Sequence, residues 1–91
     1  MKKVKPIDLV PGNLYWIKIM GFLNKILFFI DSKGRICQAD ITSNPIMLIE
    51  VLDSNYSGNI YNASIKILIG NVIGITHTND LRFFEATEID E

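Results

Sequence analysis

The chain has little of what most catalytic or metal sites require. Its 91 residues include one cysteine, Cys37, and one histidine, His77. A single cysteine excludes an intrachain disulfide and an all-cysteine metal site, and it fits a reducing compartment, so we expect a cytoplasmic protein. His77 close to Asp80 would be the candidate general base or metal ligand, but a lone histidine in a turn more often bonds the local backbone. We therefore expect no enzyme activity, no catalytic residue, no metal and no cofactor.

Long apolar runs and excess charge are also missing. No apolar run approaches the roughly 20 residues that a membrane-spanning helix needs, and no apolar segment follows the N-terminal lysines as an export signal requires. The net charge of -1 disfavours a strongly electrostatic partner such as bulk nucleic acid. A hydrophobic fraction of 48% with 21% charge excludes disorder. We expect a single domain over 1–91, with a lead-in (1–13) that Pro6 and Pro11 keep irregular and an acidic tail (87–91).

No helical period is sustained anywhere, whereas strand patterns are frequent. The clearest pattern begins where Ile65, Ile67 and Ile69 alternate with other side chains. A Gly70-Asn71 pair then supplies the positive φ values of a two-residue turn of type I′ or II′, and 72–76 resumes with β-branched residues. Residues 78–80 predict a tight turn before a last strand, 81–86. The pattern predicts a hairpin followed by one more strand.

The remaining strands are predicted on the same grounds. Residues 14–20 form the first strand, with Tyr15, Ile17 and Ile19 on its core face because side chains alternate. A second hairpin joins 25–31, which is almost continuously apolar, to 35–39 through a turn at 31–34. A loop (41–45), a strand (46–52), a polar loop (53–59) and a strand (60–69) complete the series. Within 46–52 only Glu50 is charged, and we expect it opposite Lys66 as an exposed cross-strand pair.

This series of strands and loops resembles an SH3-like barrel. That family has five strands, with a long first loop (here 21–45), a second loop (53–59), a distal hairpin (Gly70-Asn71) and a 3₁₀ turn (77–80) before the last strand. The resemblance implies an all-β fold, a five-stranded SH3-like barrel with an extra hairpin in the long first loop. The ALYDY and SNYV patterns of proline-binding members are missing, so recognition of PxxP peptides is not expected. An OB-fold would need a helix between its third and fourth strands, and none is predicted.

The informative excess is in adjacent aromatic pairs, Tyr15-Trp16, Phe28-Phe29 and Phe83-Phe84. Adjacent strand residues face opposite ways, so each pair sends one ring toward the core and one away from it. Three interpretations remain open: the 25–39 hairpin covers the outward rings as a second small core, the rings form a self-association surface, or they bind a partner protein. For the last two interpretations the predicted contact residues are Trp16, Tyr15, Phe29, Phe84 and Tyr56.

We thus predict a non-catalytic protein-interaction module, a small accessory protein that modulates a partner. Ile, Asn and Lys are frequent and have AT-rich codons, which indicates a low-GC bacterium or a phage; a phage protein would act in the host cytoplasm. The alternative function is a nucleic-acid-binding SH3-like domain, with exposed aromatics stacking on bases. Its contacts to phosphate would come from Lys18, Lys25, Lys33, Arg35, Lys66 and Arg82.

Overall fold

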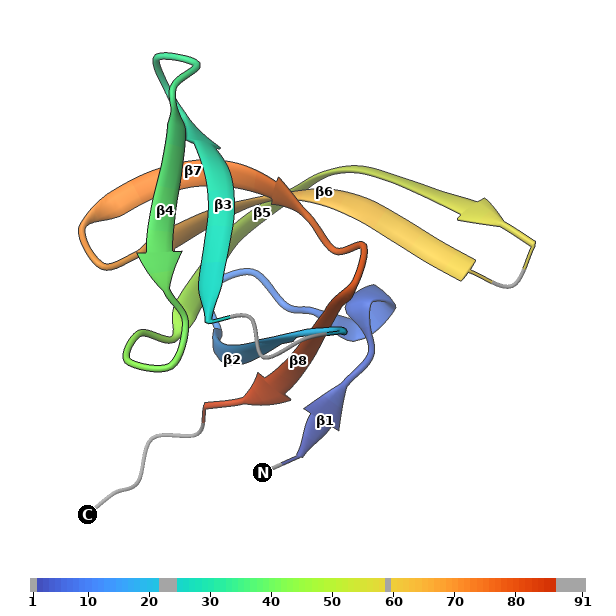
Figure 1. Cartoon of the computed structure of the whole chain (residues 1–91). Coiled ribbons are helices and arrows are strands. Elements are labelled where there is room, and N and C mark those ends of the chain that lie inside the picture. Colours follow the sequence, from blue (N-terminus) through green and yellow to red (C-terminus); the bar gives the residue numbers. More distant parts are fainter. Residues whose placement is uncertain (1, 22–24, 59, 87–91) are drawn as a thin grey trace.

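The computed structural model describes residues 2–21, 25–58 and 60–86, and within these the chain forms a single antiparallel sheet of 8 strands. The strands follow each other across the sheet in the order β1-β8-β2-β5-β6-β7-β3-β4, so β1 and β4 are its free edges (Figure 1). A 3₁₀ helix, η1, lies at Pro6–Asp8. The strands are β1 (Lys3–Val4), β2 (Leu14–Ile19), β3 (Ile26–Asp31), β4 (Ile36–Asp40), β5 (Ile46–Ser57), β6 (Ile60–Ile69), β7 (Val72–His77) and β8 (Leu81–Glu85).

The all-β class is confirmed, but the sheet is not closed, so a five-stranded SH3-like barrel is not confirmed. The β3–β4 hairpin pairs with β7 and extends the sheet on that side, so that β4 is the edge strand there. None of the helices in the described ranges has the length and apolarity that a bilayer span would need.

Both predicted hairpins are confirmed. β6 and β7 remain paired up to Ile69↔Val72, which leaves Gly70 and Asn71 as the two turn residues. Gly70 has a φ of 60° and Asn71 has a negative φ, and this combination defines a type II′ turn. The β3–β4 turn places Gly34 at φ 78, and the Gly34 N–H donates to the Asp31 carbonyl at 3.0 Å. This is a type I turn followed by a left-handed glycine, which a three-residue hairpin loop favours.

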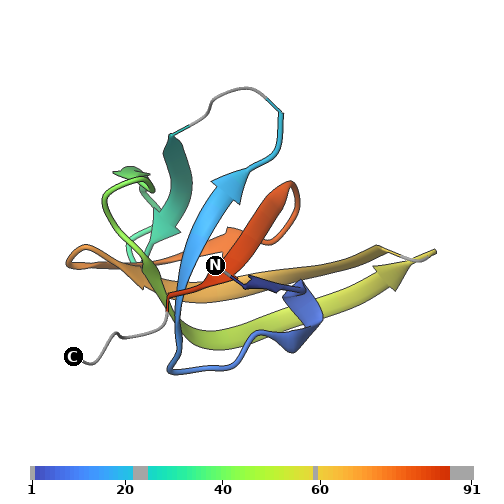
Figure 2. The same cartoon turned by 90° about the horizontal axis from the view of Figure 1, so that it is seen from below.

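The predicted polar loop at 53–59 is wrong for residues 53–57, which continue β5. β5 and β6 remain paired as far as Ser57↔Ile60, with register shifts between Leu48/Glu50 and Val51/Asp53. The β6–β7 pairing starts at Ser64↔His77, so the distal part of β5–β6 is a two-stranded ribbon. This ribbon projects well beyond the rest of the sheet (Figures 1 and 2). Cross-strand pairing therefore overrides the turn-like composition of this segment.

The lead-in is more regular than expected, since it contains β1 and η1. β1 pairs with β8 at Lys3↔Phe84 and Val4↔Phe83. After η1, Leu9 is buried, and the backbone N–H of Val10 donates to the Tyr15 hydroxyl at 2.8 Å. The segment after β1 therefore packs onto the body of the domain. The expected acidic tail (87–91) lies outside the described residues.

A single buried cluster fills the inner face of the curled sheet. The β3–β4 hairpin contributes Leu27 and Phe29 to this same cluster, so the hairpin does not form a separate second core. The Phe29 ring packs directly against the backbone of Gly74 in β7. Only glycine allows this contact, because a Cβ at position 74 would lie 2.3 Å from Cδ2 of the ring. The buried side chains are Leu9, Tyr15, Ile17, Leu27, Phe29, Ile41, Ile46, Leu48, Ala63, Ile65, Ile67, Ile69 and Phe83.

The last turn differs in kind from the expected 3₁₀ turn. The Leu81 N–H donates to the Thr78 carbonyl at 3.0 Å, but Asp80 has φ 63, which a 3₁₀ turn does not allow. His77 belongs to β7. Thr78 is buried and fastens the turn to β6, because its N–H donates to the Ala63 carbonyl at 2.9 Å and its hydroxyl accepts the Ala63 N–H at 3.0 Å.

Candidate interaction surfaces

The three aromatic pairs each split between the two faces of the sheet, as predicted. Tyr15, Phe29 and Phe83 are buried in the core. Their neighbours point outward, with Phe28 exposed and Trp16 and Phe84 half-buried. The strand alternation therefore holds at every pair.

Two of the predicted contact residues, Tyr15 and Phe29, are buried, which for Tyr15 agrees with the core face predicted for the first strand. The Tyr15 ring meets Phe83 edge-on, with centroids 6.3 Å apart and planes at 85°, and its hydroxyl is already bonded to the backbone. Phe29 lies over Gly74. The outward ring of the second pair is Phe28, which is 58% exposed.

Phe28 belongs to an uncovered apolar surface on the outer side of three strands. The register aligns Ile75, Ile30 and Ile36 across β7, β3 and β4. Phe28 lies two residues before Ile30 on the same face of β3, and Ile73 two residues before Ile75 on β7. All five are exposed, from 40% at Ile75 to 75% at Ile36. We call Phe28, Ile30, Ile36, Ile73 and Ile75 the apolar face.

The sequence of β3 contains a signal for this surface. Residues 26–30 are all apolar, so both faces of β3 had to be apolar, and only one of them can line the core. Leu27 and Phe29 take the inner face. The run therefore indicates an outer face built of the same kind of side chain.

A groove of about 540 Å³ adjoins the apolar face. It forms because β3 pairs with β7 only at Ile30↔Ile75 and Asp31↔Gly74, which leaves the first half of β3 apart from β7. Across this opening the Thr76 hydroxyl donates to the Phe28 carbonyl at 3.2 Å. The lining combines Ile19, Ile26, Phe28, Ile30, Ile36, Ile75 and Leu81 with residues of the last turn. The groove is thus a mainly apolar depression beside exposed apolar side chains.

Trp16 and Phe84 lie together on a second surface, the outer side of β1, β8 and β2. They are direct cross-strand partners, and Lys3 stands opposite Phe84 on the other side. Lys18 is opposite Arg82 one pair further along the same face. We call Trp16, Phe84, Lys3, Lys18 and Arg82 the basic-aromatic face. Of the predicted nucleic-acid contacts, it gathers Lys18 and Arg82.

Tyr56, the remaining predicted contact residue, is on the projecting β5–β6 ribbon. It is 62% exposed, and its ring meets that of its cross-strand partner Tyr61 at 5.3 Å between centroids. The structure therefore brings Trp16 and Phe84 together but places Tyr56 on a separate element.

His77 lies in a polar groove of about 670 Å³ beside the base of the ribbon. Its Nδ1 is 3.3 Å from the Ser64 hydroxyl, so its partner is Ser64, whereas the catalytic interpretation would need Asp80. Asp53 lies across β6 from His77, paired with Ser64. A catalytic serine needs a base that a third group orients, and here the carboxylate is on the wrong side of the serine. Within 2–21, 25–58 and 60–86, no three His, Cys, Asp or Glu residues gather in a way that could hold a metal ion.

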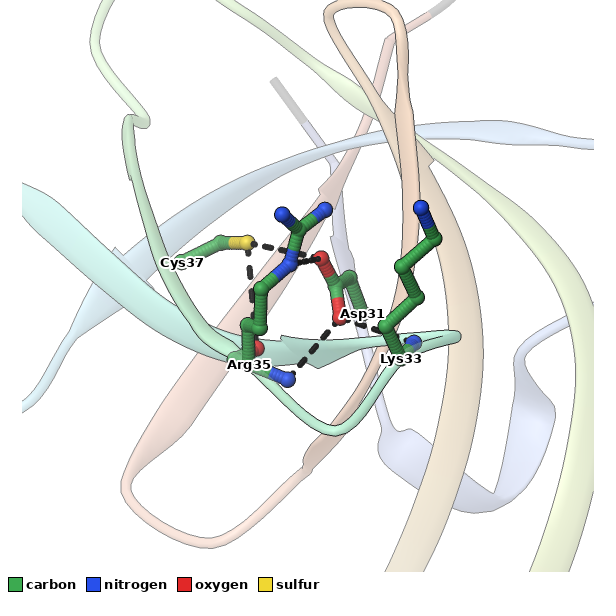
Figure 3. Close-up of polar contacts among 4 residues, drawn as sticks. All are labelled: Asp31, Lys33, Arg35 and Cys37. Carbon is green, nitrogen blue, oxygen red and sulfur yellow. Dashed lines mark hydrogen bonds and ion pairs between the residues drawn. The ribbon is translucent and has the colours of Figure 1, made fainter.

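Asp31 of the β3–β4 turn accepts hydrogen bonds from Lys33 and Arg35 (Figure 3). Asp31 Oδ1 accepts the backbone N–H groups of Lys33 and Arg35 at 2.9 Å each, and Oδ2 pairs with Arg35 Nε at 2.9 Å. The backbone N–H of Arg35, followed by that of Lys33 and the guanidinium, lowers the pKa of Asp31. Cys37 Sγ lies 3.7 Å from Asp31 Oδ2. These contacts hold the turn in shape, as an Asp at the first position of a turn usually does.

The predicted cross-strand pair of Glu50 and Lys66 is confirmed by the register of β5 and β6. Lys66 thus neighbours a carboxylate, while Lys33 and Arg35 belong to the β3–β4 turn and Lys25 directly precedes β3. The predicted phosphate contacts are consequently spread over several elements, apart from the Lys18–Arg82 pair.

Comparisons of the chain with protein-family models, with curated proteins and with solved structures find no match. Its class therefore rests on the sheet, an all-β domain with one open antiparallel sheet. Its function has to be argued from the two outer faces.

Proposed function

We propose that this chain is a non-catalytic protein-interaction module, an accessory protein that binds a partner protein through the apolar face. The observation that carries the proposal is the contiguity of the exposed side chains Phe28, Ile30, Ile36, Ile73 and Ile75 across three paired strands. Scattered exposed apolar residues are normal on a monomer, whereas a contiguous patch marks an interaction site.

The free energy of burying apolar side chains favours Phe28 as the anchor of this contact. Full burial of a Phe or Ile side chain contributes about 1.5–3 kcal/mol, and these five residues are only partly buried in the free chain. Aromatic residues are also enriched at interface centres. The groove beside Phe28 offers a depression into which an apolar side chain of the partner fits.

We also propose that the sheet is an SH3-like arrangement opened by its extra hairpin. The strands β8, β2, β5, β6 and β7 are consecutive in the sheet, and they correspond to the five strands of the sequence resemblance. β3 and β4 come from the long first loop and extend the sheet beyond β7. On this proposal, the hairpin both opens the barrel and supplies most of the apolar face.

The test uses affinity purification of the tagged full chain from lysate of its source organism, with nuclease, followed by mass spectrometry. A Phe28→Ser variant should lose the partner that the wild type retains, with little change in thermal stability because the ring is 58% exposed. Ile60→Ser is the matched control, since Ile60 is 62% exposed but lies on the ribbon. Retention of the partner by Phe28→Ser at wild-type strength would refute the proposal.

A second candidate function, single-stranded nucleic-acid binding, is favoured by the basic-aromatic face. There, Trp16 and Phe84 adjoin Lys3, Lys18 and Arg82, the combination that stacks on bases and contacts phosphates. Fluorescence anisotropy with a labelled oligonucleotide would show binding that weakens steeply with salt and is reduced in Trp16→Ala. Absence of binding at low salt would end this alternative.

A further inference from the structure

The backbone of the edge strand β4 has a definite orientation. The Asp31 N–H donates to the Arg35 carbonyl and the Ile41 N–H to the Lys25 carbonyl, each at 2.9 Å, at the two ends of the β3–β4 ladder. Hydrogen-bonded and non-bonded pairs alternate along an antiparallel ladder. Residues 37 and 39 therefore bond to β3, while the backbone groups of Ile36, Gln38 and Asp40 point away from the sheet.

Most of these outward groups have no partner among the described residues. The Asp40 carbonyl accepts the Asn44 side-chain amide at 3.0 Å, but the N–H and C=O groups of Ile36 and Gln38 form no bond in the described part of the chain. Such an edge is a template for another strand, and proteins usually protect it with proline, lysine or a bulge. None of these devices occurs within Ile36–Asp40.

We propose that β4 pairs antiparallel with β4 of a second copy of this chain, with Ile36 opposite Gln38 of the second copy. This register uses the unpartnered groups of both residues in both copies, which makes four backbone hydrogen bonds, two for each facing pair. The two-fold axis then passes beside Cys37, and the two sheets continue into one another. The inference goes beyond the proposed function and does not depend on it.

Two-fold symmetry selects antiparallel pairing of two copies. The outward N–H and C=O groups repeat at Ile36 and Gln38, so each copy offers the other the same set of donors and acceptors. Such an isologous contact closes with two copies. A two-fold axis perpendicular to the sheet also keeps both apolar faces on one side. Because a five-residue edge buries little area, the dimer forms only at high protein concentration.

The first test is sedimentation velocity of the full chain from micromolar to millimolar concentration. The wild type should shift from monomer to dimer, and Gln38→Pro should stay monomeric at an unchanged melting temperature, because the lost N–H points away from β3. Gln38→Ala keeps the backbone donor and should dimerise like the wild type. A monomeric wild type at millimolar concentration, or dimers of Gln38→Pro, would overturn the inference.

The second test checks the proposed β4–β4 register by disulfide cross-linking of Cys37. Facing non-bonded residues in an antiparallel pair have Cα atoms about 4.5 Å apart, within the range that a disulfide spans. Diamide takes up two protons and two electrons from the facing thiols, which should yield a disulfide-linked dimer in the wild type and none in Gln38→Pro. Wild-type dimers that diamide cannot link would overturn this register. Phe28→Ser should still be linked, so failure of the partner-binding proposal and failure of this inference are distinguishable.

Discussion

Replacing Gly74 by alanine tests how the β3–β4 hairpin is fastened to the sheet. An added Cβ would lie 2.3 Å from Phe29 Cδ2 and 2.9 Å from the Ile30 carbonyl oxygen, both far below normal contact distance. Neither the Phe29 ring nor the Ile30 carbonyl can easily move away from position 74. The Phe29 ring is 3% exposed within the core, and the Ile30 carbonyl belongs to the short stretch where β3 pairs with β7. The substitution therefore has to move β3.

The cost is set by two opposing effects. Forcing an extra methyl into a filled site typically costs 1–3 kcal/mol, and the double obstruction here places Gly74→Ala near the upper end. Alanine is favoured over glycine in a strand by roughly 0.5–1 kcal/mol, because the unfolded chain loses less entropy. The overpacking wins, and we expect a net loss of about 2 kcal/mol. For a domain of this size that lowers Tm by roughly 8–16 °C.

Urea denaturation followed by Trp16 fluorescence and by far-UV circular dichroism measures this loss. Phe29→Leu removes part of the obstructing ring, so Gly74→Ala should cost less in a Phe29→Leu background than alone. The coupling energy should be at least 0.5 kcal/mol in the sense of rescue. An unchanged denaturation midpoint in Gly74→Ala, or strictly additive effects in the double mutant, would refute the close contact between Gly74 and Phe29.

Two further predictions concern polar contacts. Thr78→Val keeps the shape of the side chain but leaves the buried Ala63 N–H without its acceptor. The free energy of unfolding, measured by urea denaturation, should therefore fall by about 1–3 kcal/mol. Thr78→Ser keeps the hydroxyl and should retain most of the wild-type stability. The Arg35 N–H lowers the pKa of Asp31 in the folded protein. The ionised Asp31 carboxylate therefore stabilises the fold fully at pH values above its ordinary pKa of 3.8, and this stabilisation is lost as the pH falls through the pKa of the folded state. Melting curves from neutral to acid pH should therefore fall less steeply for Asp31→Asn; identical slopes would contradict this linkage.

The hairpins were predictable because their information is local. Gly70-Asn71 and the 31–34 turn carry the residues that these turn types require, and the flanking runs have the period of a strand. The burial of alternate residues followed from the same period, which is why every aromatic pair splits between the two faces. In the first strand one face is more apolar than the other, and this identifies Tyr15 as the buried ring. In β3 both faces are apolar, so the local pattern does not say whether Phe28 or Phe29 is buried, and that choice depends on the partner strand.

The open sheet and the ribbon depend on long-range pairing that local sequence does not specify. β3 joins β7 through Ile30↔Ile75, residues far apart in the chain, and this contact extends the sheet instead of closing it. In the ribbon, Asp53 and Tyr56 belong to a segment whose composition is typical of turns, yet they pair with Ser64 and Tyr61. Pairing with an existing strand supplies the hydrogen bonds that the segment would lack alone. Composition therefore predicts a loop where the neighbouring strand makes a ribbon.

On the proposed function, stability and recognition are separable, because the core and the proposed contact surface lie on opposite faces of the same strands. In β3, Phe29 fills the core against Gly74, and Phe28 one residue earlier contributes little to folding because most of its surface stays in water. Changing Phe29 therefore acts on the folding equilibrium, and changing Phe28 acts on whatever the outer face contacts. The continuous apolar run of β3 places apolar side chains on both faces, one of which lines the core, while the other is the surface that we propose a partner covers.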